Sequence, residues 1–174
     1  ALFDPAKLRW MNGEYIKALS FEEFCRIAAP WLDKSVACGR YDYTLLCALL
    51  HSRTEVLSDI PAMVEFLPEV APHDTELYLH KKFKLTRELT LSAIKLCRDA
   101  LSALPSFDAA SVHDCLIGVA QENAMKNGQV LWPVRVALTG LQSTPGGAVE
   151  LAEILGREET LRRLDAAIEK LSGC

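Results

Sequence analysis

The chain has 174 residues, of which 50% are hydrophobic and 24% charged, the composition of one globular domain or of two small ones. Its formal net charge of −4 argues against a protein that binds nucleic acid through overall charge, although it leaves room for a local basic face. The sequence contains no signal peptide and no apolar run of membrane-spanning length.

Helix signals begin near the N-terminal end. Asp4 followed by Pro5 predicts a helix cap with proline at the first helical position, and Gly13 is expected to weaken or bend that helix. Ser20 and Glu23 form a capping box for the next helix. In chain order, the expected helices cover residues 5–19, 21–38, 41–53, 61–67, 74–80, 85–104, 109–125, 129–139, 144–155 and 158–171.

Glycine and proline set the expected ends of the later helices. Asn127 and Gly128 are expected to take the left-handed conformation after one helix, and Gly140 stops the next. Thr144 and Pro145 then predict the start of another helix.

No segment alternates like a strand, so the sequence predicts an all-α protein. We expect two small helical subdomains, residues 1–80 and 81–174, with the seam in the proline-rich region around 61–72 and the lysine run that follows.

The sequence offers no catalytic constellation, no Gly-rich phosphate loop and no nucleophile elbow, so no catalytic or cofactor-binding residue is expected. No C-x-x-C pair exists and the histidines complete no zinc pattern, so no metal site is expected. The cysteines are interpreted as small buried hydrophobes in a reducing cytosol. They are Cys25, Cys38, Cys47, Cys97, Cys115 and Cys174.

Two basic features have alternative interpretations. Lys81, Lys82, Lys84 and Arg87 cluster before and at a helix start, where such charges are either simply solvated or in contact with phosphates. Arg53 lies at a helix C-terminus, where it favours the helix dipole in any case.

The segment NGQVLWPVRVALTGLQSTPGG, residues 127–147, combines a core helix with a polar face. Trp132, Arg135 and Thr139 share one face by helical spacing, which suits base stacking and hydrogen bonding to single-stranded RNA. A half-buried tryptophan beside an arginine that reaches water explains the same spacing. A separate stripe is expected to face the core and consists of Val130, Leu131, Val134 and Leu138.

Four segments together resemble bacterial-type glutamyl-tRNA synthetases. They are residues 3–16 (FDPAKLRWMNGEYI), 128–140 (GQVLWPVRVALTG), 143–147 (STPGG) and 154–164 (ILGREETLRRL). The resemblance implies that the chain is the all-α C-terminal anticodon-binding region of a class I synthetase. The first residue is Ala1, not methionine, so we expect a fragment of a longer protein. The two class I signature motifs and the ATP site of this family do not occur in the sequence, so the resemblance implies that the chain lacks the catalytic domain and is inactive alone.

The resemblance also implies a partner and a parent enzyme. The partner would be tRNA(Glu), bound through its anticodon loop. The parent glutamate–tRNA ligase, expected to be cytoplasmic and monomeric, would use ATP and Mg²⁺ in its catalytic domain to attach glutamate to that tRNA. This chain would hold neither ATP nor the metal.

Site residues follow from the matched motifs. Arg135, Thr144, Pro145 and Gly146 match the arginine and the Thr-Pro-Gly turn that contact the first two anticodon bases in this family. Arg53 matches, more loosely, the arginine that reads the third base. The alternative hypothesis is a helical protein-interaction module without RNA binding, which the net negative charge and apolar content favour.

Overall fold

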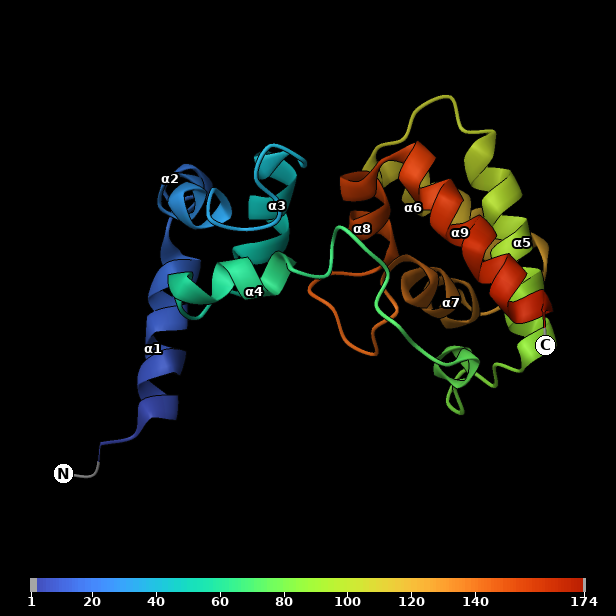
Figure 1. The fold of residues 1–174 in the computed structure, drawn as a ribbon, viewed down its shortest axis with the longest axis horizontal. Coiled ribbons are helices and arrows are strands. Elements are labelled where there is room, and N and C mark those ends of the chain that lie inside the picture. The colour runs from blue at the N-terminus through green and yellow to red at the C-terminus, as the bar shows by residue number, and fades with distance from the viewer. Residues whose placement is uncertain (1–2, 174) are drawn as a thin grey trace. The chain divides into compact units, whose positions relative to one another are not determined.

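The computed structural model describes residues 3–173, so Cys174 lies outside the described residues. Within them every regular element is helical, which confirms the all-α prediction (Figure 1). The α-helices are α1 (Pro5–Ala18), α2 (Phe21–Leu32), α3 (Tyr43–Leu50), α4 (Ile60–Val64), α5 (Arg87–Ser102), α6 (Ala109–Glu122), α7 (Asn127–Thr139), α8 (Ala148–Leu155) and α9 (Arg157–Ser172), with 3-10 turns η1 (Leu57–Asp59) and η2 (Thr75–Tyr78). No helix between residues 3 and 173 is both long and apolar enough to cross a membrane.

The chain divides into two compact units, unit 1 (Ala1–Pro68) and unit 2 (Glu69–Cys174). The division falls inside the expected proline-rich seam but earlier than the expected boundary at residue 80. The reason is that the segment 69–80 packs onto α7: the amide of Ala71 donates to the carbonyl of Thr139 at 2.9 Å, and the Tyr78 side chain is fully buried.

Unit 1 is built around α2, which packs against α3, α4 and η1. Its core contains Phe24, Leu32 and Leu46, all fully buried. The predicted capping box is confirmed: the Glu23 amide donates to the Ser20 hydroxyl at 3.2 Å, and the Ser20 amide donates to the Glu23 carboxylate at 3.2 Å.

Gly13, which was expected to weaken or bend its helix, does not interrupt it. Helix α1 runs unbroken from Pro5 to Ala18, and the predicted cap is confirmed because the Asp4 carboxylate accepts from two amides of the first turn. Gly13 is buried, and a Cβ atom there would lie 3.1 Å from Cγ of Glu55. The glycine therefore serves close packing rather than bending.

Unit 2 is organised around α7, which contacts α5, α6, α8 and α9 (Figure 1). Three of the four residues expected to face the core, Val130, Val134 and Leu138, are fully buried, whereas Leu131 is only half-buried. Val136 is buried as well. A helix surrounded in this way buries more than one stripe, which is why the amphipathic pattern of α7 is weak in the sequence.

The expected left-handed turn at Asn127 and Gly128 is wrong. Helix α6 ends at Glu122, Ala124 takes a positive φ of 52°, and Asn127 and Gly128 form the first turn of α7. A Cβ atom at Gly128 would overlap the ring of Phe83, so this position needs glycine for space rather than for its dihedral angles. Because α7 begins at Asn127, Pro133 lies in its interior rather than in its first turn.

A buried arginine joins α9 to the end of α7. The side chain of Arg163 is 1% exposed; it donates from Nε to Glu159 at 2.7 Å and from Nη1 to the carbonyl of Leu138 at 2.7 Å. Hydrogen bonds from Arg162 and then from Arg163 lower the pKa of Glu159 to about 2, although its partial burial opposes this shift.

The cysteines only partly follow the expectation. Cys47 and Cys97 are buried, and burial raises the pKa of each thiol to about 12, while Cys38 is exposed. All five cysteines in the described residues are free thiols. The structure also shows no group of three or more His, Cys, Asp or Glu side chains placed to hold a metal ion within residues 3–173.

Candidate nucleic-acid interface

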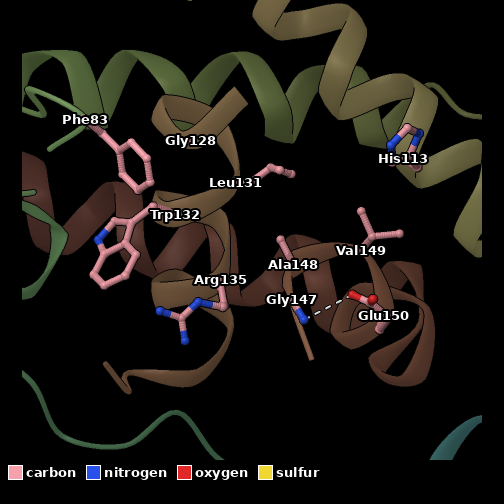
Figure 2. A pocket seen from close by; sticks show the side chains of 10 residues that line it. All are labelled: Phe83, His113, Gly128, Leu131, Trp132, Arg135, Gly147, Ala148, Val149 and Glu150. Carbon is pink, nitrogen blue, oxygen red and sulfur yellow. Dashed lines mark hydrogen bonds between the residues drawn. The ribbon is translucent and has the colours of Figure 1, made fainter. Parts of the chain in front are cut away.

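Arg135 projects from α7 toward the loop that follows the helix. Its Nη1 donates to the Thr144 hydroxyl at 3.0 Å and its Nη2 to the carbonyl of Gln142 at 2.7 Å. The guanidinium also lies over the indole of Trp132, with Cζ 4.8 Å from the ring centroid, which is a cation–π contact (Figure 2). Three independent contacts therefore fix the orientation of this cation.

The loop can meet Arg135 because α7 ends abruptly. Gly140 takes a left-handed φ of 68° and its amide donates to the carbonyl of Val136 at 2.7 Å, as predicted for a helix stop. A Cβ atom at Gly140 would collide with the carbonyl oxygen of Ala71 and lie 2.7 Å from Nδ1 of His73. Only glycine fits both the dihedral angle and the space at this turn.

Thr144 and Pro145 do not start a helix, which corrects the prediction. Helix α8 begins only at Ala148, and residues 144–147 remain a turn. The Thr144 hydroxyl, which accepts from Arg135, donates to the carbonyl of Gly146 at 3.0 Å, and Gly146 has a φ of 82°. The hydroxyl is thus used inside the turn instead of capping a helix.

A cavity of about 460 Å³ opens between the start of α7 and the start of α8 (Figure 2). Trp132 and Arg135 line it from α7, and Gly147 and Glu150 line it from the other side. The Glu150 carboxylate accepts from the Gly147 amide at 3.0 Å and holds the turn in place. The cavity therefore combines apolar walls, a fixed cation and a carboxylate, which are groups that stack on bases and contact their polar edges.

Burial changes the electrostatics of Arg135. Partial burial lowers the pKa of its guanidinium, because removal from water disfavours the charged form. An arginine nevertheless stays protonated, and it offers only donors. It is suited to the carbonyl and ring-nitrogen acceptors of a base or to a phosphate.

The structure brings four of the expected site residues together within unit 2. Arg135, Thr144 and Gly146 form one hydrogen-bonded chain, and Pro145 lies between the last two. The face expected to hold Trp132, Arg135 and Thr139 is only partly present. Thr139 is buried, and its hydroxyl donates to the Arg135 carbonyl at 2.8 Å, so it supports the helix end instead.

Arg53 belongs to unit 1 and follows the end of α3. Its side chain is exposed, and its Nη1 donates to the carbonyl of Leu49 in the last turn of that helix at 2.7 Å. This contact is the one expected of any arginine at a helix C-terminus.

The basic cluster before α5 splits into two kinds of residue. Lys81, Lys82 and Lys84 are exposed. Arg87 is partly buried, and its Nε and Nη2 donate to the carbonyl of Leu171 at 2.9 and 2.6 Å. Arg87 therefore links the start of α5 to the end of α9, while the three lysines face solvent.

Two aromatic side chains that contact Trp132 were not predicted from the sequence. The His80 ring stacks on Phe83 with centroids 4.4 Å apart, and it meets the Trp132 ring edge-on at 4.4 Å. The indole Nε1 of Trp132 donates to the carbonyl of Leu77 at 3.1 Å. In the sequence, Phe83 is visible only as an aromatic residue inside the lysine run 81–84. That pattern does not indicate a contact with Trp132.

Comparisons with known proteins place this arrangement in a family. The family model described as "Anticodon binding domain" matches residues 10–168. The glutamate–tRNA ligase of Clostridium tetani is 44% identical over 171 residues, which cover 98% of this chain and 35% of that protein. The corresponding ligase of Lachnoclostridium phytofermentans is 43% identical over 172 residues, 99% of this chain and 35% of that protein.

A solved structure supports the fold. The glutamate tRNA ligase of Elizabethkingia meningosepticum, determined in complex with its amino acid, superposes with a TM-score of 0.77 at 24% identity, covering 97% of this chain and 33% of that one. The chain thus spans about a third of the length of the relatives it matches.

Proposed function

We propose that this chain, which belongs to the anticodon-binding domain family, recognises the anticodon of tRNA(Glu) as part of a glutamate–tRNA ligase. The parent enzyme would attach glutamate to that tRNA with ATP and Mg²⁺ bound in a catalytic domain outside the matched third. We place the parent in the cytoplasm and propose that it acts as a monomer.

One observation carries the proposal: Arg135 is held in a fixed orientation in the wall of a cavity of about 460 Å³. Its guanidinium is supported by the Trp132 ring, the Thr144 hydroxyl and the Gln142 carbonyl. A cation that is already oriented loses little further freedom on binding, which favours affinity. We propose that Arg135 and the turn of Thr144, Pro145 and Gly146 contact the first two anticodon bases.

We propose that Arg53 reads the third anticodon base. Its exposed guanidinium offers only donors, which suit the O2 and N3 acceptors of cytosine. Guanine would present N1–H and N2–H donors toward the same group, so the arginine would favour one base and reject the other. A chain of this kind would thereby distinguish tRNA(Glu) from tRNA(Gln).

Phosphate contacts are proposed for the basic cluster before α5. Because Arg87 already donates two hydrogen bonds to Leu171, this role rests chiefly on the exposed Lys81, Lys82 and Lys84. Such contacts add affinity without sequence preference.

The function can be tested by titrating an RNA stem-loop that carries the tRNA(Glu) anticodon into this chain. We expect Arg135→Ala to weaken binding by roughly tenfold or more, the scale of a lost base-edge contact. Lys95→Gln, a control on α5 outside the proposed interface, should leave affinity within about twofold. An unchanged affinity of Arg135→Ala would remove this residue from the interface.

A helical protein-interaction module is the second candidate, and one observation favours it. Several large apolar side chains of α1 are exposed, among them Trp10 at 59% and Tyr15 at 71%. Salt separates the two functions, because phosphate contacts make RNA affinity fall steeply with added salt. The absence of stem-loop binding even at low salt would favour the interaction module.

A further inference from the structure

Trp132 connects the proposed anticodon contact to the segment that begins unit 2. The face of its indole supports the guanidinium of Arg135, with Cζ 4.8 Å from the ring centroid. The indole N–H donates to the carbonyl of Leu77 at 3.1 Å, in the 3-10 turn η2. The ring of Trp132 therefore joins α7 to a residue that lies 55 positions earlier in the sequence.

The segment 77–83 is itself fixed to α7 by further contacts. His80 stacks on Phe83 at 4.4 Å and meets the Trp132 ring edge-on at 4.4 Å. The carbonyl of Phe83 accepts from Nε2 of Gln129 at 2.8 Å, and its ring fills the space beside Gly128. Because both ends of this segment contact α7, its conformation determines where the Trp132 ring lies.

The position of the ring matters for the guanidinium above it. Cation–π attraction depends on the cation lying over the ring face, and a free indole can rotate about its side-chain bonds. The hydrogen bond to Leu77 restricts that rotation. The ring then presents a constant surface to Arg135, while the Thr144 hydroxyl accepts a hydrogen bond from Nη1 of the guanidinium at 3.0 Å.

We infer that Trp132 is a positioning residue for Arg135, and that the segment 77–83 holds the ring in the orientation that positions this arginine for the RNA. The inference rests on the proposed function, since it assumes that Arg135 contacts a base. It adds a role for the segment 77–83 of unit 2, which carries no base contact of its own in the proposal.

A double-mutant cycle tests this role. The dissociation constant of the anticodon stem-loop is measured for the wild-type chain, Trp132→Phe, Arg135→Ala and the double variant, at low ionic strength so that weak complexes stay measurable. Phenylalanine keeps an aromatic face but lacks the N–H. We expect Trp132→Phe to weaken binding about three- to tenfold when Arg135 is present, and less than about twofold when it is absent.

His80→Leu provides a second variant in case the change at Trp132 impairs folding. The Nδ1 atom of His80 is buried and has no hydrogen-bond partner in the described part of the chain, so leucine removes ring stacking without breaking a bond at that atom. We expect a weaker effect of the same kind, about two- to threefold, again present only together with Arg135.

Trp31→Phe is the matched control. Trp31 on α2 of unit 1 also lies under a cation, with Nζ of Lys34 5.0 Å from its ring centroid, but it is outside the proposed interface. It should leave binding unchanged in both backgrounds.

Two results would overturn the inference. An equal loss for Trp132→Phe with and without Arg135 would mean that the tryptophan contacts RNA directly or acts through general stability. If Trp132→Phe lowers the stem-loop affinity in neither background, Trp132 does not position Arg135. The same cycle also tests the proposed function of this site. That function would be refuted if the Arg135→Ala variant bound the stem-loop as tightly as the wild type.

Discussion

Arg53 and Arg135 are both arginines near helix ends, yet their surroundings differ. Arg135 in unit 2 is fixed by a ring, a hydroxyl and a carbonyl. Arg53 in unit 1 is exposed and donates to a carbonyl of its own helix end. The proposed interface thus contains one pre-oriented cation and one that must settle on its base during binding. We therefore expect RNA binding through Arg135 to depend on the residues around it. Binding through Arg53 should depend mainly on its own side chain.

Two glycines offer the strongest test of this difference, because both have a φ of 68°. Beside Gly140 a Cβ atom would collide with Ala71 and His73, whereas beside Gly39 in unit 1 it would meet nothing within 4 Å. We expect Gly140→Ala to lower the free energy of unfolding by about 3–5 kcal/mol, from strain and overpacking together. Gly39→Ala should cost about 1–2 kcal/mol, from the dihedral strain alone.

Urea denaturation of the two variants measures both values. Equal losses in the free energy of unfolding would show that the close packing at Gly140 contributes nothing to stability. Weaker RNA binding by Gly39→Ala than by Gly140→Ala would contradict the proposed dependence of Arg135 on its surroundings.

The acid dependence of stability is the next largest effect and arises in unit 2. Glu159 has its pKa lowered to about 2, so its contribution is present above the ordinary pKa of about 4.3 and is lost as pH falls toward 2. We expect Glu159→Gln to lower the free energy of unfolding at neutral pH by about 2–3 kcal/mol, since buried Arg163 loses its carboxylate partner. The loss should shrink as pH falls through that window.

Glu14→Gln in unit 1 is the matched control for this measurement. Its carboxylate pairs with Lys17 at 2.8 Å, but both side chains are nearly half exposed. A surface pair of this kind contributes less than about 0.5 kcal/mol. A Glu159→Gln variant whose loss stays the same between pH 7 and pH 2.5 would disprove the role of this carboxylate.

Arg53→Gln should have the smallest effect on the fold and a selective effect on binding. We expect a stability change within about 0.5 kcal/mol, because the side chain is exposed. The preference for cytosine over guanine at the third anticodon base should narrow by about 1 kcal/mol. Titrations with the two stem-loops measure it, and an unchanged preference would assign the third base to another residue.

Local signals in the sequence predicted most helices. They failed where contacts with residues far away in the sequence determine the local conformation. Asp4 and Ser20 cap their helices as predicted, because capping depends on residues only two or three positions away. The Asn127–Gly128 pair has the composition of a left-handed turn, yet the Phe83 ring requires glycine there within a helix. The sequence spacing contains no information on that contact.

The candidate site shows the same limit. The spacing of Trp132 and Arg135 correctly placed them on one face, but left open whether the arginine simply reaches water. The structure adds the hydroxyl of Thr144, whose expected helix-start role is replaced by a bond to Arg135. The contact of Trp132 with Leu77 joins residues 55 positions apart, which no local pattern reports.

Whether this chain reads an anticodon can be decided from the base specificity of the wild-type chain. Its dissociation constant is measured for a stem-loop with the tRNA(Glu) anticodon and for one in which only the second anticodon base is changed. We expect the first stem-loop to bind roughly tenfold or more tightly, the scale of one lost base-edge contact. Equal affinities for the two stem-loops would contradict this expectation.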